Sequence, residues 1–247
     1  MIALEIGIIG LGRFGRFASE ILKHDFKVSV FDHRKINPPR GVRQEPLEVV
    51  ASKPILVFCI PISQIESACK DIKPFLYPGQ LLLDTCSVKV YPIRIMRRIL
   101  PRFVEIVGTH PLFGPDSAHQ GIRGFRIALC PVRCLRLEKI KTFLEEKGLR
   151  VIVTTPERHD REMAKTQALY HFLARGVAGL RIKVGALSTP GPARLFDEFR
   201  DVQKDSLELF YDLQTQNPHA GSIRRSLLKR LSQIERDLSR RNRKSHS

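Results

Sequence analysis

The chain has 247 residues, 43% of them hydrophobic, and a formal net charge of +17. This hydrophobic content excludes wholesale disorder, and no apolar stretch approaches the ~20 residues that a membrane-spanning helix needs. The N-terminus lacks the basic region of a signal peptide and the cysteines are scattered, so we expect a cytoplasmic protein with reduced thiols. A plastid location would require that a transit peptide had been removed. Cys130 and Cys134 have no second pair of ligands, so no metal site is predicted.

The first 155 residues alternate short apolar runs with amphipathic segments, which is the pattern of a parallel α/β sheet. Strands are predicted at 5–9, 27–31, 55–60, 81–84, 104–107, 126–129 and 150–153. Helices are predicted at 14–23, 62–75, 92–100 and 137–147. After Thr155 strand-like runs stop, and helical periodicity covers 158–180, 194–216 and 222–238 around a Gly/Ser/Pro-rich loop at 185–192. We predict a Rossmann-type, mostly parallel sheet domain over 1–155 and a small all-helical domain over 156–247 with a basic tail.

A Gly-x-Gly-x-x-Gly motif, Gly10 to Gly15, directly follows the first apolar strand and opens an amphipathic helix. In this context the motif predicts a turn that binds the pyrophosphate of a dinucleotide at the helix N-terminus. Asp32 ends the second strand, where a carboxylate can bind both ribose hydroxyls of NAD, whereas Arg34 could bind the 2′-phosphate of NADP. We favour NAD and leave NADP open. The alternative is an ordinary strand–helix turn with Asp32 as a strand-end cap. The candidate cofactor-binding residues are Gly10, Gly12, Arg13, Phe14, Gly15, Asp32, His33, Arg34, Pro61 and Ser63.

Two polar clusters follow later strands, and they supply the candidate catalytic residues. Residues 84–89 (Asp-Thr-Cys-Ser-Val-Lys) follow one strand, and residues 109–115 (Thr-His-Pro-Leu-Phe-Gly-Pro) follow another. Ligands bind outside the carboxyl ends of such strands, so both clusters would face a bound nicotinamide. His110 can accept the proton of a substrate hydroxyl, because neutral imidazole is a suitable base. Ser87 could hydrogen-bond His110 and set its tautomer; the alternatives are a satisfied loop histidine and a helix N-cap serine.

These motifs resemble the prephenate/arogenate dehydrogenase family of tyrosine biosynthesis, and the plant-like arogenate type most. The His-Pro-Leu-Phe-Gly-Pro string at 110–115 is the most specific mark, and Glu157-Arg158-His159-Asp160 resembles the start of the family's helical domain. The resemblance implies NAD(P)-dependent oxidative decarboxylation of prephenate or arogenate, with His110 as the base. It also implies a homodimer formed through the helical domain.

The resemblance further implies a set of substrate-binding residues: Ser87, Lys89, His110, Gln167, His171 and Arg200. Lys89 would steer the anionic substrate, while Gln167 and His171, four residues apart, would share one helix face. Family members that act on prephenate hold a substrate carboxylate with an arginine, and here Asp201 stands at or next to that position with Arg200 adjacent. Prephenate and arogenate therefore both remain candidate substrates.

Two other classes of protein remain open. One is a β-hydroxyacid or imine-type dehydrogenase of similar fold, which would lack the His-Pro-Leu-Phe-Gly-Pro string. The other is a non-catalytic dinucleotide- or nucleic-acid-binding protein, for which the charge of +17 is the only support. No basic platform interleaved with aromatic residues is visible, so we expect no specific nucleic-acid partner and no membrane partner.

Overall fold

The structure is a computed structural model that describes residues 4–244. The chain divides into two compact units, Met1–His159 and Asp160–Ser247. Among the described residues, every helix is either too short or too polar to span a lipid bilayer.

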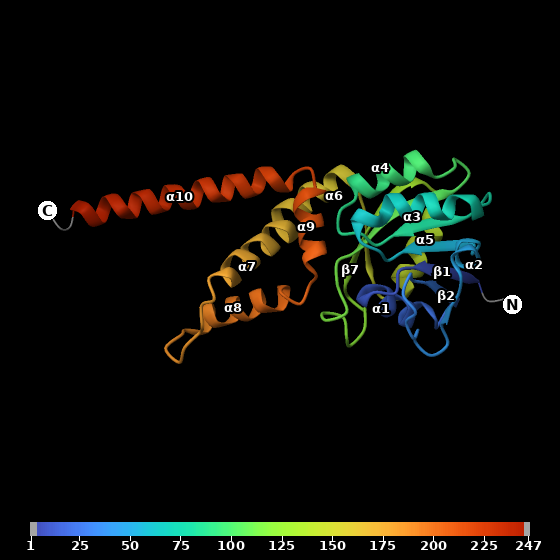
Figure 1. The fold of residues 1–247 in the computed structure, drawn as a ribbon, viewed down its shortest axis with the longest axis horizontal. Coiled ribbons are helices and arrows are strands. Elements are labelled where there is room, and N and C mark those ends of the chain that lie inside the picture. The colour runs from blue at the N-terminus through green and yellow to red at the C-terminus, as the bar shows by residue number, and fades with distance from the viewer. Residues whose placement is uncertain (1–3, 245–247) are drawn as a thin grey trace. The chain divides into compact units, whose positions relative to one another are not determined.

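Within residues 4–159 the strands form one eight-stranded sheet with the order β3-β2-β1-β4-β5-β6-β7-β8 (Figure 1). The strands are β1 (Glu5–Ile9), β2 (Lys27–Phe31), β3 (Arg43–Gln44), β4 (Ile55–Phe58), β5 (Leu81–Asp84), β6 (Glu105–Pro111), β7 (Arg126–Arg133) and β8 (Arg150–Val153). The first six are parallel, β7 is antiparallel to β6, and β8 is parallel to β7. The chain reverses its direction of winding between β1 and β4, which is where open α/β sheets bind ligands.

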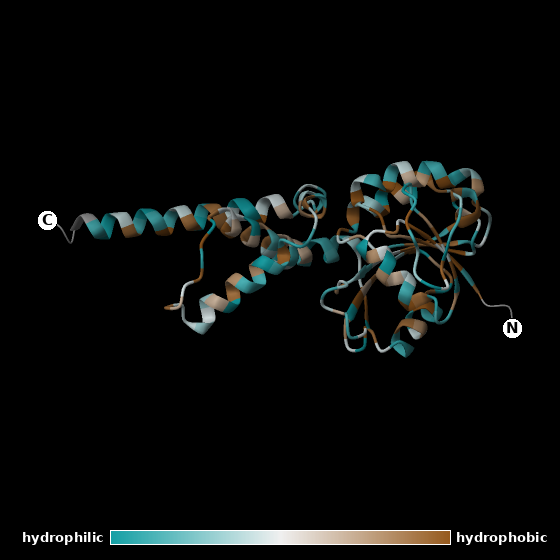
Figure 2. Ribbon diagram, turned by 60° about the horizontal axis from the view of Figure 1, so that its bottom comes forward, coloured by the Kyte–Doolittle hydropathy of each residue, from teal (hydrophilic) through white to brown (hydrophobic). Residues whose placement is uncertain are grey.

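Hydrophobic residues concentrate in the central strands, as Figure 2 shows. Ile8 and Leu56, for example, are fully buried, because a parallel sheet is covered on both faces. The first unit's helices are α1 (Arg13–Leu22), α2 (Leu47–Ala51), the short η1 (Ile62–Gln64), α3 (Ile65–Ile72), the short η2 (Lys73–Phe75), α4 (Val90–Ile99) and α5 (Leu137–Glu146). Helix α6 (Pro156–Met163) continues from this unit into the next.

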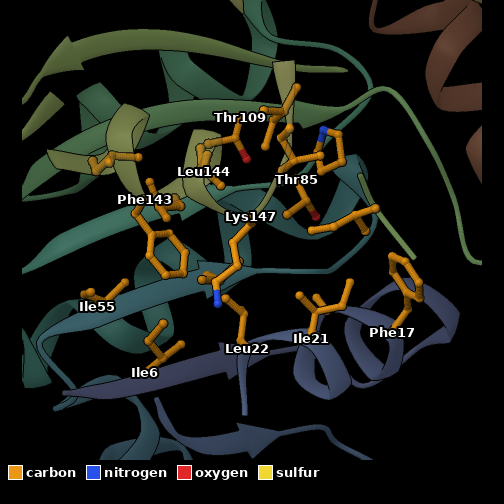
Figure 3. Close-up of a pocket in the computed structure, with 18 of the residues that line it drawn as sticks. Ile6, Phe17, Ile21, Leu22, Ile55, Thr85, Thr109, Phe143, Leu144 and Lys147 are labelled. Atoms are coloured by element: carbon orange, nitrogen blue, oxygen red, sulfur yellow. The ribbon is translucent and has the colours of Figure 1, made fainter. Parts of the chain in front are cut away.

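Between α1 and α5, side chains leave a cavity of about 160 Å³ against the sheet (Figure 3). Its lining is almost entirely apolar and includes Phe17, Ile21 and Phe143. Gly10 and His110 do not line it, but Phe14, Thr109 and Pro111 do, so the cavity adjoins the candidate active site.

The second unit contains only helices among its described residues. They are the π-helical η3 (Ala164–Ala168), α7 (Leu169–Gly179), α8 (Pro190–Val202), α9 (Leu207–Thr215) and the 25-residue α10 (Ala220–Lys244), together with the end of α6. Ala174, Phe199 and Val202 form the buried centre where α7 packs on α8.

The predicted fold class, a Rossmann-type sheet followed by a helical region, is confirmed. One predicted boundary is wrong in a way that matters for the site. Strand β6 continues to Pro111 rather than ending at Val107, because β7 pairs with it and places His110 opposite Ala128. His110 therefore lies in a strand and not in a loop.

The helix predicted at 194–216 is interrupted after Val202, and Ser206 caps the new helix α9 through a hydrogen bond from the Leu209 N–H.

Candidate active site

The turn after β1 has the backbone that a dinucleotide pyrophosphate requires. Gly10 adopts φ +99°, and a Cβ atom there would lie 2.5 Å from the Cys59 carbonyl oxygen. A Cβ atom at Gly15 would lie 2.0 Å from the Gly10 carbonyl oxygen, so α1 can pack this close to β1 only with glycine. Gly12, the N-cap of α1, faces open space instead. Backbone N–H groups at a helix N-terminus with open space before them can bind phosphate, so the turn fits the cofactor.

Asp32 lies next to this turn at the end of β2. Its Oδ2 accepts a hydrogen bond from the Leu11 N–H (2.9 Å), and its Oδ1 accepts one from the Arg34 N–H (3.0 Å) and one from Arg34 Nε (3.1 Å). Burial alone would raise the pKa of Asp32, but the hydrogen bonds from Arg34 and Leu11 outweigh it and lower the pKa. Asp32 is thus an anionic acceptor, while the paired Arg34 side chain is 70% exposed.

The other candidate cofactor residues lie at or near the same edge of the sheet. Pro61 precedes η1, and Ser63 lies within it, directly after β4. The His33 ring packs edge-on against Phe31 at the end of β2. Arg13, at the start of α1, donates to both carboxylate oxygens of Asp116 at 2.7 Å, which ties the Gly-rich turn to the segment after β6.

A buried ion pair holds the ends of β5 and β6 together. Lys89 and Asp84 are both fully buried, and Lys89 Nζ contacts the Asp84 carboxylate and donates to the Thr109 carbonyl oxygen at 2.5 Å. Burial raises the pKa of Asp84, and the charge of Lys89 opposes that shift. The expectation that Lys89 steers an anionic substrate is therefore wrong, because its ammonium is buried against these partners. Lys89 instead fixes the backbone next to His110.

His110 is 3% exposed, and its Nδ1 lies 2.8 Å from Nε2 of His159, which is 4% exposed. The two rings meet edge to face with centroids 5.0 Å apart. Burial, followed by the charges of His159 and Lys89, holds the pKa of His110 well below its usual range. His110 is therefore a neutral imidazole at neutral pH.

The expected hydrogen bond between Ser87 and His110 is absent from the described residues, and His159 takes that place. Ser87 is half-buried, just beyond the end of β5. Sequence reasoning assigned His159 no role, because it lies 49 residues from His110. The available signal was the string Glu157-Arg158-His159-Asp160 at the start of a helix. Such a string does not by itself indicate that the His159 ring contacts another ring.

In the second unit, Gln167 lies in the π-helical turn η3 and His171 lies in α7. Among the described residues, Gln167 Oε1 and His171 Nδ1 are buried without a hydrogen-bond partner. His171 Nε2 lies 3.8 Å from Asp205 Oδ2; burial lowers the pKa of His171 and Asp205 opposes this. Unsatisfied buried polar atoms and a π-helical turn both recur at functional sites. Within residues 4–244 the structure describes no hydrogen bond between these two side chains, so their shared role in binding substrate stays a prediction.

Arg200 is not brought into that group by any contact that the structure describes. It lies on α8 with a side chain that is 71% exposed, and it pairs with Asp197 one turn earlier. Asp201, its neighbour, pairs with Lys204 at 2.6 Å. Arg175 lies one turn after His171 and donates to the Asp205 carbonyl oxygen at 2.6 Å. Sequence reasoning did not single out Arg175.

Comparison with known proteins places these features in a family. Residues 37–153 match the family described as "Prephenate dehydrogenase, nucleotide-binding domain". The chain is 30% identical over 234 residues to "Arogenate dehydrogenase 2, chloroplastic" of Arabidopsis thaliana. The matched region covers 88% of this chain and 65% of that protein. It is 30% identical over 178 residues to "Probable arogenate/prephenate dehydrogenase" of Methanocaldococcus jannaschii, covering 67% of this chain and 39% of the relative. The chain thus spans between about a third and two thirds of the lengths of such relatives.

Solved structures show the same fold. Prephenate dehydrogenase of Aquifex aeolicus, in complex with hydroxyphenyl propionate and NAD+, superposes with a TM-score of 0.76 at 19% identity, covering 97% of this chain and 92% of that one. Arogenate dehydrogenase of Synechocystis superposes with a TM-score of 0.65 at 20% identity, covering 96% and 90%. Taken with the motifs at 10–15 and 110–115, these similarities show that the chain belongs to the prephenate/arogenate dehydrogenase family.

Proposed function

We propose that this protein catalyses the NAD(P)-dependent oxidative decarboxylation of prephenate to 4-hydroxyphenylpyruvate, or of arogenate to tyrosine. The observation that carries the proposal is a buried, neutral His110 at the carboxyl edge of a sheet whose first turn fits a dinucleotide. The names of the relatives support the substrate class. In this proposal residues 1–155 bind the dinucleotide, and residues 156–247 bind substrate and form a homodimer.

The chemistry needs one base at the ring hydroxyl. A bound nicotinamide supplies the acceptor for the hydride that leaves C4 of the substrate ring. As the hydride leaves, the C4 hydroxyl proton moves to Nε2 of His110, and the C4–O bond becomes a carbonyl. The ring carboxylate then departs as CO2, and the electron pair of the broken C–C bond makes the ring aromatic. The resulting phenolate oxygen takes the proton back from His110, so the base is regenerated.

His110 is suited to this step because it is uncharged before the reaction. Its lowered pKa keeps an imidazole lone pair available at neutral pH, and it also makes imidazolium a strong acid that readily returns the proton. The Lys89 ammonium, which donates to the Thr109 carbonyl oxygen, holds the adjacent backbone in place. Effective proton transfer needs donor and acceptor to stay within hydrogen-bond reach, so this rigidity favours catalysis.

For the cofactor, we propose NAD. The Asp32 carboxylate is ionised beside the Gly-rich turn, where it can accept hydrogen bonds from ribose hydroxyls and would repel a 2′-phosphate. The exposed Arg34 guanidinium keeps NADP as the second candidate, because the 2′-phosphate could replace Asp32 as its ionic partner. Binding of either cofactor involves the backbone N–H groups at the N-terminus of α1.

For the substrate, we propose that Gln167, His171, Arg200 and Ser87 make contacts. The unsatisfied Gln167 Oε1 and His171 Nδ1 support this role for the first two, since a ligand would supply the missing partners. Arg200 could exchange Asp197 for a substrate carboxylate, because the pair is exposed and rotatable.

The test is a two-by-two assay of the purified chain with prephenate or L-arogenate, each with NAD or NADP. Reduced cofactor is followed at 340 nm and CO2 release is measured in parallel. We expect one CO2 for each reduced cofactor with at least one substrate. Turnover of simple 3-hydroxyacids without CO2 release, and none of the two cyclohexadienyl acids, would refute the proposal.

A further inference from the structure

The contact between His110 and His159 has a direction that the reaction chemistry determines. Two imidazole nitrogens 2.8 Å apart share one hydrogen, so one ring donates and the other accepts. If His159 Nε2 donated, His110 would carry its own hydrogen on Nε2 and could not take a proton there. If His110 Nδ1 donates, Nε2 of His110 keeps the lone pair. Catalysis by His110 through Nε2 therefore requires His159 Nε2 to be the acceptor.

That direction also sets the tautomer of His159. For Nε2 of His159 to accept, the ring hydrogen of His159 must lie on Nδ1. The backbone of His159 is held in the first turn of α6, because its backbone N–H donates to the Thr155 carbonyl oxygen at 2.9 Å.

The same contact fixes the orientation of the His110 ring. The backbone of His110 is held in the register of β6 with β7, but a ring can still rotate about its side-chain bonds. Ser87 does not restrain it in the described structure, and the Thr109 hydroxyl donates to the Asp84 carbonyl oxygen instead. The hydrogen bond to His159, in a site where both rings are almost fully buried, is thus the directional restraint on the ring.

We propose that His159 is a positioning residue for the base: it accepts the Nδ1–H hydrogen bond of His110 and holds Nε2 of His110 toward the substrate hydroxyl. This inference rests on the proposed function. In the reaction step the substrate O–H bond breaks and an Nε2–H bond forms on His110, while the Nδ1 hydrogen stays on His110. His159 gives up and takes up no proton. It stabilises the positive ring by accepting a charge-assisted hydrogen bond.

The first test compares two variants of the full chain. His159→Leu fills a similar volume but removes the acceptor, whereas His159→Gln offers an amide oxygen that can accept. We expect His159→Leu to lower kcat about 10- to 100-fold with KM changed less than about 3-fold, as for other groups that orient a functional histidine. His159→Gln should regain most of the lost kcat. The control is His24→Leu, at an exposed histidine, which should match the wild type. Equal kcat for His159→Leu and wild type, or equal loss in both His159 variants, would overturn the proposal.

The second test does not depend on turnover. Nitrogen-15 NMR of the imidazole rings, assigned with His110→Asn, reports which nitrogen of His110 carries hydrogen. We expect the Nδ1–H form in the wild-type chain and in His159→Gln, and a mixture of tautomers in His159→Leu. An Nε2–H form in the wild type would overturn the proposal even if the chain is active. If the wild type turns over neither cyclohexadienyl acid but shows Nδ1–H, the proposed function fails while the positioning contact stands. If His159→Leu does not fold, the proposal is still tested by the His110 tautomer in the wild type and by the tautomer and kcat of His159→Gln.

Discussion

The buried pair of Lys89 and Asp84 gives the sharpest prediction for stability. Lys89→Met keeps the length of the side chain but leaves the Asp84 carboxylate buried without its counter-charge, since both side chains are fully buried. Breaking a buried pair in this way costs about 3–5 kcal/mol. With a urea dependence of about 2–3 kcal/mol per M, the midpoint of unfolding should fall by about 1–2.5 M. The double variant Asp84→Asn/Lys89→Met should recover at least half of the loss, because it leaves no buried charge.

The penalty should also depend on pH. Without Lys89, burial raises the pKa of Asp84 further above its unfolded value. Stability of the Lys89→Met variant should therefore be greatest in acid, where the carboxyl is neutral in both states, and fall as pH rises through the folded-state pKa. The assay is urea unfolding followed by far-UV circular dichroism at pH 5 and pH 8. Lys70→Met removes an exposed pair with Glu66 and should stay close to the wild type. A Lys89→Met loss below about 1 kcal/mol, independent of pH, would refute the reasoning.

Three further outcomes follow from the structure. Because the pKa of His110 is lowered, and the base works only when deprotonated, activity should persist as pH falls below 6.5; a kcat/KM profile whose acid limb lies at or above pH 6.5 would contradict this. Ala18→Leu adds apolar atoms to the 160 Å³ cavity beside α1 and should raise stability by about 1 kcal/mol, measured as a higher Tm; an unchanged or lower Tm would contradict this. Arg34→Ala should raise KM for NADP at least 10-fold and leave KM for NAD nearly unchanged in steady-state kinetics; equal effects on both cofactors would exclude a 2′-phosphate contact.

Local patterns were sufficient to predict five of the six parallel strands. Strand β1, the Gly-rich turn and α1 are adjacent in sequence, and their residues carry both the periodicity and the glycines that the backbone needs. The short β3 and α2, over Arg43–Gln44 and Leu47–Ala51, were not predicted, because two to five residues are too few to show a period.

The features that depend on distant parts of the chain could not be predicted. The extension of β6 to Pro111 needs the partner strand β7, which joins it through antiparallel pairing. The burial of Lys89 joins residues 20 positions apart: its Nζ donates to the Thr109 carbonyl oxygen, and its Cδ lies where a Cβ atom at Gly108 would be 3.4 Å away. An aliphatic stem of this kind beneath a glycine leaves no periodic mark in the sequence. Ser87 was predicted as a hydrogen-bond partner of His110, whereas helix α6 brings His159 into that contact from 49 residues away.

The measurement that tests the central claim most directly is kcat of His110→Asn with the better of the two cyclohexadienyl acids. Asn keeps a polar group of similar reach but cannot accept the proton, so general-base catalysis is lost. We predict a kcat lower by about 10²–10⁴-fold, with the substrate Kd, measured by calorimetry, changed little. Turnover of His110→Asn within a few-fold of the wild type would contradict the assignment of His110 as the base.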